Sequence, residues 1–337
     1  MKKGATILRI SFCMVAPSLE NDRNGDSIVK KFYSNKLAII LFVSPALLLF
    51  TLMVFYPIVQ VIVKSFYEWN GLGSGIFIGF DNYVKLFGDT VFKISNKNAL
   101  IFAVFITVFQ MTLASIFALV VSDKKTKGRN FLRVAYFIPV VLSVTVVCQL
   151  WLAILNADTG LLNTMFSALG INYQQNWLSD RHKAIYVIAF VNAWQWMGYQ
   201  FALIMAGIKA IPADYYEAAR IDGASTIQAH TKVTIPLLKD TYKVCLTISL
   251  TGGIKAFTEM FIMTKGGPGN ATYTLTYLMY KAAFREFRYG YGMASASVLV
   301  LQCLVIILII NWLFRDKDKI KEEGRDIGWF RKKLQAR

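Results

Sequence analysis

Residues 213–238 read ADYYEAARIDGASTIQAHTKVTIPLL, and they separate two long apolar segments of the chain. This stretch predicts two short helices joined by a sharp turn. Asp214 can cap the first helix, with Glu217 following three residues later. Gly223 can take the left-handed conformation that ends a helix, and a Ser-x-x-Gln capping box at 225–228 then opens the second. We therefore expect a rigid helical knob, and residues 213–238 are called the knob below.

Small side chains at Ala218, Ala219 and Ala224 would let another surface approach the knob closely. Pro236 either stops the second helix or kinks the entry into the next apolar segment. The same features would also suit a well-made surface turn. Capping chemistry therefore explains the shape of the knob without naming a partner for it.

The segments around the knob are long and apolar. Of the 337 residues, 55% are hydrophobic and 17% are charged, whereas soluble domains carry about 25% charged residues. A helix of about 20 apolar residues crosses the hydrocarbon core of a bilayer. We therefore expect an all-α membrane protein with six transmembrane helices, at 37–63, 99–121, 134–157, 184–208, 244–264 and within 289–314.

The fifth of these segments contains two charges, Lys255 and Glu259. Each costs about 2.5–3.5 kcal/mol at the centre of an inserted helix. Because they lie four residues apart, they would share one helix face and could form an intramembrane ion pair. Two interpretations stay open: a buried ion pair that faces a partner subunit, or two groups that line a transport path and tune its selectivity.

The distribution of positive charge predicts the orientation in the membrane. Lys and Arg number 26 in the two tails and the loops after spans two and four, against 10 in the other loops. The positive-inside rule then places both termini and the knob in the cytoplasm. The predicted divisions are a cytoplasmic tail at 1–36, the first span with an extracytoplasmic loop at 37–98, a five-helix core at 99–314, and a cytoplasmic tail at 315–337.

Several functional classes are disfavoured by the composition. The net charge of +17 follows from the cytoplasmic loops and tails, so nucleic acid is not an expected partner. The histidines, His182 and His230, lie far apart, and no cysteine pair has ligand spacing; we expect no metal site, disulfide framework or catalytic residue. The chain has no Walker motif and is not expected to hydrolyse ATP itself. The cysteines are Cys13, Cys148, Cys245 and Cys303.

The run Glu217-Ala-Ala-Arg-Ile-Asp-Gly223, followed by Ile235-Pro236, resembles the EAA loop of binding-protein-dependent ABC importer permeases with a MetI-like transmembrane domain. In that family the loop is a coupling helix, which docks into a cleft of an ATPase subunit. The sequence departs from the usual pattern at Ile235, His230 and Asp240, but it keeps the glutamate and the glycine. The resemblance implies that the ATPase-coupling residues are Glu217, Ala218, Ala219, Asp222, Gly223 and Pro236.

Two further regions resemble the carbohydrate branch of this family. Ser65-Phe-Tyr-Glu-Trp-Asn-Gly71 and Phe80-Asp-Asn-Tyr83 resemble the loop after the first span in the first permease subunit of maltose, lactose and glycerol-phosphate importers. Thr264-Lys-Gly-Gly-Pro268, with Ala282-Ala-Phe284 and Gly290-Tyr-Gly292, resembles the same branch between spans five and six.

The resemblance implies a subunit of the cytoplasmic (inner) membrane that imports a sugar, an oligosaccharide in particular, by alternating access. Its implied partners are a second, homologous permease, two ATPase subunits that bind ATP and Mg, and an extracytoplasmic substrate-binding protein. This chain itself would hold no cofactor.

The fourth span carries the groups that sugar recognition needs, namely aromatic faces and amides. Asn192, Gln195, Trp196 and Tyr199 are spaced at three and four residues, so they fall roughly on one helix face. Such residues usually face a cavity, although hydrogen bonding between helices would explain them as well. The resemblance to the maltose branch implies sugar contact for these four and, on the fifth span, for Ser249, Gly252, Gly253 and Ala256.

Two other functional classes stay open at this point. A secondary transporter would need intramembrane acids and often has inverted repeats, but Glu259 is the single candidate acid and no repeat is evident. A membrane scaffold would need no transport cavity at all.

Overall fold

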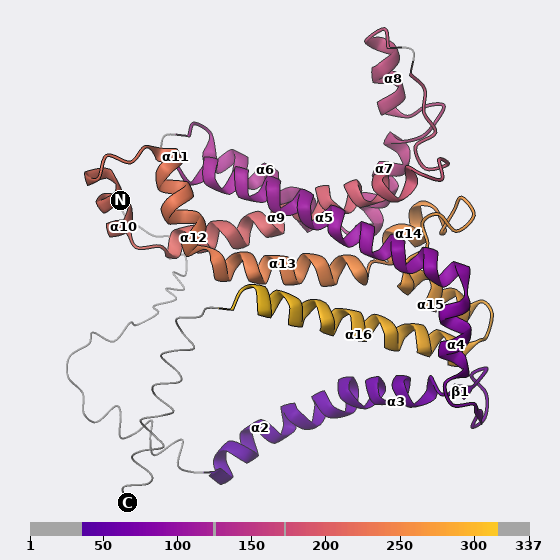
Figure 1. Ribbon diagram of the computed structural model, residues 1–337. Helices are drawn as coiled ribbons and strands as arrows, with labels where there is room; N and C mark the ends of the chain where they lie inside the picture. Colours follow the sequence, from indigo (N-terminus) through magenta and orange to yellow (C-terminus); the bar gives the residue numbers. More distant parts are fainter. Residues whose placement is uncertain (1–35, 124–125, 172, 316–337) are drawn as a thin grey trace, which may run out of the picture. The chain divides into compact units, whose positions relative to one another are not determined.

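The computed structural model describes residues 36–315, with the exception of 124, 125 and 172. Cys13 and nearly all of the two predicted tails lie outside the described residues. The described chain is helical apart from its loops and one two-stranded antiparallel sheet (Figure 1), which confirms the predicted all-α class. The chain forms two compact units, Met1–Gln60 and Val61–Arg337.

The first unit contains most of the helical segment of the first predicted span. Helix α2 (Lys36–Phe50) continues through the π-helical turn η1 (Thr51–Phe55) into α3 (Tyr56–Lys64), which runs on into the second unit. The π turn ends two residues before Pro57, which has no N–H to continue the α-helical pattern. Residues Ile39–Lys64 are long and apolar enough to cross a membrane.

The second unit consists of a short hairpin and a helical bundle. The hairpin pairs β1 (Tyr67–Glu68) with β2 (Ile76–Phe77). The helices in chain order are α4 (Asp81–Gly88), α5 (Thr90–Ser122), α6 (Arg129–Val141), α7 (Val144–Ile154), α8 (Leu161–Ala168), α9 (Ala184–Ala210), α10 (Ala213–Ile221), α11 (Thr226–Ala229), the π turn η2 (His230–Thr234), α12 (Ile235–Leu237), α13 (Lys239–Ile254), α14 (Thr258–Met263), α15 (Leu275–Phe284) and α16 (Tyr289–Leu313).

By length and composition, four helical segments in the described chain can cross a membrane, or five if the bent pair α6–α7 counts as one span. Helix α9 is 27 residues long but is not among them. Amides at Asn192, Gln195 and Gln200 interrupt its apolar run. The predicted number of six spans therefore stays a prediction.

Two predicted spans are not continuous helices. The third bends by 99° between α6 and α7, where Leu142 and Ser143 have extended backbone. The fifth ends at Ile254 and resumes at Thr258. Thr274 donates a hydrogen bond to the Ala256 carbonyl oxygen at 2.9 Å, so one backbone group freed at this interruption finds a partner. Residues 255–257 are called the break below.

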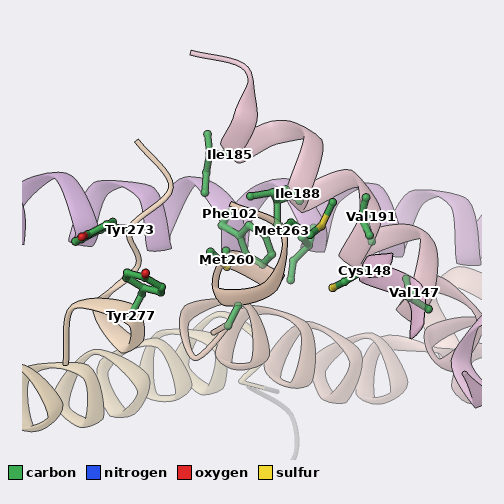
Figure 2. Packing of buried hydrophobic residues seen from close by; sticks show 14 of the residues in the cluster. Phe102, Val147, Cys148, Ile185, Ile188, Val191, Met260, Met263, Tyr273 and Tyr277 are labelled. Atoms are coloured by element: carbon green, nitrogen blue, oxygen red, sulfur yellow. The ribbon is translucent and has the colours of Figure 1, made fainter. Parts of the chain in front are cut away.

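A buried apolar cluster holds the short helices against the long ones (Figure 2). Phe102 of α5, Val147 and Cys148 of α7, and Ile188 of α9 meet Met260 of α14, and all five are wholly buried. Cys148 lies among apolar side chains in this cluster. The cluster fixes α14 beside α7 and α9.

Helices α5 and α13 approach each other at Gly253. A Cβ atom added there would lie 2.6 Å from Ala103 Cα, whereas one added at Gly252 would meet nothing within 4 Å. Only hydrogen at residue 253 permits this distance between the two backbones.

Replacement of Gly253 with alanine is therefore expected to force α5 and α13 apart and to lower the free energy of unfolding by about 1–3 kcal/mol. Gly252→Ala is the matched control, because it adds the same methyl group in open space and raises helix propensity. Thermal unfolding of the two purified variants measures the difference. Equal midpoints for the two would show that the contact at residue 253 is unimportant.

Two distant sequence motifs pack together beside the hairpin. Asn82 Nδ2 donates to the carbonyl oxygens of Ser65 and Tyr67, at 2.8 and 2.9 Å. The Gly290 N–H donates to the Trp69 carbonyl oxygen at 3.1 Å, and the ring centroids of Trp69 and Tyr289 are 5.6 Å apart. The loop after α3 and the start of α16 therefore form one packed structure.

Asn82→Ala is expected to destabilise this structure by about 2 kcal/mol, since it leaves two carbonyl groups without their donor in a buried place. Asn70→Ala, at an exposed asparagine of the same loop, should change stability little. Thermal unfolding compares the two, and a similar loss for both would contradict the role given to Asn82.

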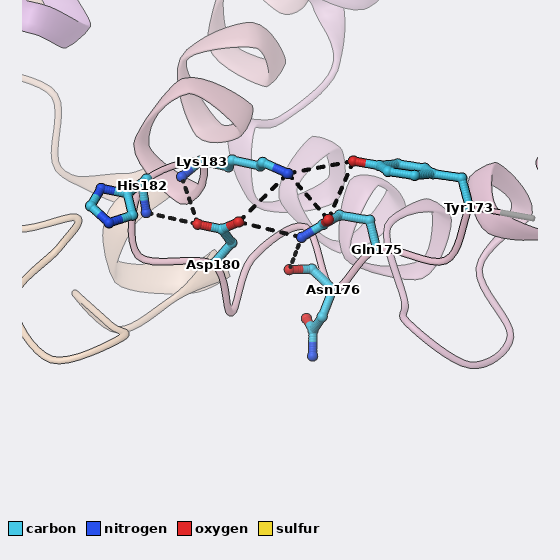
Figure 3. A network of polar contacts seen from close by, with 6 residues as sticks. All are labelled: Tyr173, Gln175, Asn176, Asp180, His182 and Lys183. Carbon is cyan, nitrogen blue, oxygen red and sulfur yellow. Dashed lines mark hydrogen bonds and ion pairs between the residues drawn. The ribbon is translucent and has the colours of Figure 1, made fainter.

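A polar network precedes α9 (Figure 3). Asp180 Oδ1 accepts hydrogen bonds from the backbone N–H groups of His182, at 2.9 Å, and Lys183, at 3.3 Å. These donors, that of His182 above all, hold the pKa of Asp180 below its usual range. Lys183 Nζ lies 3.6 Å from Asp180 Oδ2 and 3.2 Å from Gln175 Oε1. The ionised carboxylate therefore orders the turn from which α9 begins.

Candidate functional site

A cavity of about 300 Å³ lies where α5, α9, α13 and α14 meet. The structure brings to it seven of the eight residues that the sequence assigns to a substrate path: Asn192, Trp196, Tyr199, Ser249, Gly252, Gly253 and Ala256. They come from α9, α13 and the break, which are separate in the sequence. Whether a sugar contacts them is not tested by the geometry, so that assignment stays a prediction.

The eighth residue, Gln195, does not line the cavity. Its side chain is 1% exposed, and its Nε2 donates to the Leu142 carbonyl oxygen at 2.9 Å. That carbonyl group lies at the bend between α6 and α7, where the helical hydrogen bonds are interrupted. In this structure Gln195 is therefore a packing residue between helices, which is the alternative interpretation of the polar residues on α9.

A chain of hydrogen bonds crosses the wall of the cavity. Ser249 Oγ accepts from Thr107 Oγ1 at 3.1 Å and donates to Gln110 Oε1 at 2.9 Å. Gln110 Nε2 donates to Asn192 Oδ1 at 3.4 Å, and Asn192 Nδ2 donates to Glu259 Oε1 at 2.5 Å. All five side chains are buried. The network joins four helices and is called the polar chain below.

Three of the buried polar residues here were missed by the sequence-based assignment. Gln110 and Gln200 both line the cavity, and Thr107 is part of the polar chain. Thr107 and Gln110 are three residues apart within an apolar run, so the argument applied to Asn192 could have found them. Gln200 is 2% exposed, and its Oε1 has no hydrogen-bond partner in the described part of the chain.

The structure does not form the predicted pair of Lys255 and Glu259 on one helix face. Lys255 lies in the break and is exposed, whereas Glu259 lies in α14 and is 5% exposed. Among the ion pairs of the described residues none joins the two, and Glu259 accepts a hydrogen bond from Asn192 instead. Because the helix is interrupted between them, the spacing of four residues does not bring the two side chains together. Both residues line the cavity.

The knob is built largely as its residues predict. Gly223 has a φ of +75° after α10, which is the left-handed region. The Ser225 N–H donates to Gln228 Oε1 and the Gln228 N–H donates to Ser225 Oγ, at 2.8 and 3.3 Å, so the capping box is formed. Asp214 does not cap α10, because the helix already begins at Ala213, with Pro212 as the preceding residue. Asp214 therefore lies in the first turn of α10, where its negative charge interacts favourably with the helix dipole.

The end of the knob leads directly into the wall of the cavity. Pro236 lies inside α12, which follows the π turn η2, so it does not stop the second helix. The chain bends at Leu238 and continues as α13 (Figure 1). This is the alternative in which Pro236 accompanies a kink at the entry to the fifth span.

The surface of the knob exposes polar and apolar groups together. Glu217, Ala218 and Gly223 are exposed, and Ile221 and Ile227 are 86% and 76% exposed. Large apolar side chains at the tip of a polar loop are typical of a contact surface. The arrangement suits docking, and the coupling residues stay a prediction.

Residues 37–317 match a family described as "Binding-protein-dependent transport system inner membrane component". The chain is 38% identical over 284 residues to YurN of Bacillus subtilis, a probable ABC transporter permease protein, covering 83% of this chain and 97% of that one. It is 32% identical over 280 residues to AraP of the same species, an arabinooligosaccharides transport system permease protein, covering 82% and 88%.

The fold is similar to that of a chain in the crystal structure of a bacterial ABC transporter involved in the import of the acidic polysaccharide alginate. The TM-score is 0.74 at 23% sequence identity, and the match covers 86% of this chain and 98% of that one. At this identity the likeness shows the fold alone.

Proposed function

Given that this chain belongs to the family of binding-protein-dependent transport system inner membrane components, we propose that it is the sugar-translocating permease of an ATP-driven importer. A transport component of this family is not itself an enzyme. The family leaves no support for a secondary transporter or a scaffold. The relative named for arabinooligosaccharide transport supports a sugar as the substrate.

The cavity is the observation that carries the sugar assignment. Trp196 and Tyr199 supply aromatic faces for the apolar sides of a sugar ring. Asn192, Gln110 and Gln200 supply amide groups for its hydroxyls. The unpartnered Gln200 Oε1 is an acceptor for a hydroxyl that a substrate would bring.

Glu259 and Lys255 are assigned to the substrate path rather than to an ion pair. Both line the cavity, and Glu259 is held there by the Asn192 amide. A carboxylate in this wall favours hydroxyl donors and disfavours acidic groups on the substrate. This is the second of the two interpretations left open by the sequence.

The proposed assembly adds partners to this chain. A second, homologous permease completes the transmembrane pathway, two ATPase subunits bind ATP and Mg on the cytoplasmic side, and an extracytoplasmic protein delivers the sugar. Both termini and the knob lie in the cytoplasm.

In the proposed mechanism, closure of the ATPases moves the knob, the helices reorient, and the cavity opens alternately to the two sides. The exposed surface of the knob and the positive-inside charge distribution support this arrangement.

An uptake experiment tests the proposal. A strain that lacks the chain is expected to lose import of at least one labelled oligosaccharide, and wild-type protein should restore it. Trp196→Ala should restore much less, whereas Trp312→Ala, at a 71% exposed tryptophan on α16, should restore uptake fully. A strain without the chain that still imports every oligosaccharide on which it grows would refute the transport function.

A further inference from the structure

A groove along α5 has one basic end and one apolar end. Two concave regions on this helix, of about 440 and 570 Å³, share Leu100 and Ile101 in their walls and so form one continuous surface. We propose that this groove binds a phospholipid with an anionic headgroup. The proposal is independent of which substrate the cavity transports.

The basic end carries two lysines, Lys93 and Lys97, which lie four residues apart and therefore on one face of α5. Both side chains are exposed, and none of the ion pairs among the described residues involves either of them. Asn96 adds an amide group between them and accepts a hydrogen bond from Gln302 at 2.6 Å. Two like charges at this spacing repel each other, and a bound anion removes that cost.

The lysines stand at the depth of the headgroups. Helix α5 has 33 residues, so it is about 50 Å long, while the hydrocarbon core is about 30 Å thick. Its first two turns therefore extend beyond the hydrocarbon, and the apolar run begins directly after Lys97 and Asn98. Figure 1 shows α4, next to which α5 begins, at the end of the second unit away from α10 and α11.

The apolar end of the groove continues along the same face of α5, as an apolar stripe about as long as one leaflet is deep. Leu100, Val104 and Val108 are 41%, 54% and 60% exposed. The rings of Phe105 and Phe109 stack beside them with centroids 6.2 Å apart, and Tyr186 of α9 lies 5.9 Å from Phe105. Lys97 and Phe109 are separated by about 18 Å along the helix axis, which is close to half the hydrocarbon thickness. That length suits one acyl chain below a headgroup on the lysines.

Both ends together select the occupant. A free phosphate would use the lysines and leave the apolar stripe empty, and a neutral lipid would use the stripe and leave the lysines unpaired. An anionic phospholipid complements both at once. A transmembrane helix of another protein segment would cover the apolar stripe without supplying an anion to Lys93 and Lys97.

Lipid binding to the intact transporter tests the proposal. The full chain, purified in detergent with its co-expressed partner subunits, is titrated with phosphatidylglycerol, with phosphatidylcholine of the same acyl chains, and with inorganic phosphate, and bound lipid is counted by native mass spectrometry. We expect phosphatidylglycerol to be retained over phosphatidylcholine, and phosphate not to displace it.

The double variant Lys93→Gln with Lys97→Gln should weaken phosphatidylglycerol binding by roughly 25-fold, about fivefold for each lysine. Lys85→Gln, at an exposed lysine of α4 outside the groove, should change nothing.

A second pair of variants tests the apolar end without touching the charges. Val104→Trp fills the groove and is expected to reduce retention of phosphatidylglycerol, whereas Leu308→Trp on α16, at a residue that is 66% exposed, should not. Equal retention of the two lipids, or no effect of the lysine changes, would overturn the proposal. Displacement by phosphate would show a simple anion site, and no retained phospholipid in the wild type would show that the groove does not bind the proposed ligand; either result would also refute it.

Discussion

Replacement of Glu217 with lysine is expected to reduce uptake to less than about a tenth of the wild-type rate while the protein stays in the membrane, because reversing a charge within an interface removes electrostatic complementarity worth several kcal/mol. Glu217 is exposed on α10, so the folded chain itself loses no buried contact. The loss would arise at the surface that receives the knob. Uptake of labelled sugar, with the amount of chain in the membrane measured in parallel, separates coupling from folding.

Two controls isolate the knob. Asp158→Lys reverses the same charge at an exposed residue of the loop between α7 and α8, and it should leave uptake unchanged. Gly223→Asp and Gly223→Asn place nearly the same side chain at a φ of +75°, where a Cβ would meet nothing within 4 Å of this chain. Both residues tolerate the left-handed region better than most, so a loss confined to the aspartate variant reports charge at the docking surface. Undiminished co-purification of an ATPase subunit with both Glu217→Lys and Gly223→Asp would refute docking through the knob.

Asn192→Leu is expected to lower both the stability and the uptake rate. Asn192 is 8% exposed and joins Gln110 to Glu259 through its amide. Leucine fills similar space but leaves a buried carboxyl group and a buried amide without their partner, which costs about 1–3 kcal/mol for each group. It also removes an amide available to a sugar hydroxyl, so we expect uptake to fall about tenfold or more.

The concentration dependence of uptake distinguishes these two effects. Gln195→Leu is the matched control, because Gln195 is another buried amide on α9, and it donates to the Leu142 carbonyl oxygen outside the cavity. It should lower the thermal midpoint of the protein and leave the substrate affinity unchanged. Unchanged affinity in Asn192→Leu as well would remove Asn192 from the substrate path.

Local features of the chain were the ones that the sequence could predict. The capping box of Ser225 and Gln228 and the left-handed Gly223 depend on residues within a few positions of each other, and both are formed. Helix interruptions depend on distant partners. At the bend, the Leu142 carbonyl oxygen accepts a hydrogen bond from Gln195, and at the break the Ala256 carbonyl oxygen accepts one from Thr274. Neither partner could be recognised from hydropathy, because an interrupted span and a continuous one have the same composition.

The same reasoning explains the partial success at the cavity. The spacing of Asn192, Trp196 and Tyr199 placed them on one face, and the structure brings them to one cavity. Gln195 lies at a spacing that fits the same face, but a carbonyl group at the bend captures its amide. A polar residue within a span is a reliable sign that its side chain is buried. Whether that side chain faces a cavity or another helix depends on which backbone groups of the neighbouring helices are left unpaired.

The break has a mechanical consequence. From Thr226 to Ile254 the chain is helical almost without interruption, through α11, η2, α12 and α13. Helix α13 alone, with 16 residues, is a lever about 24 Å long. Its near end is fixed to the knob and its far end stops at Lys255, beside the cavity. If the knob moves as proposed, we expect α13 to carry Ser249 and Gly252 with it, with the break as the hinge, while α14 stays packed against α7 and α9.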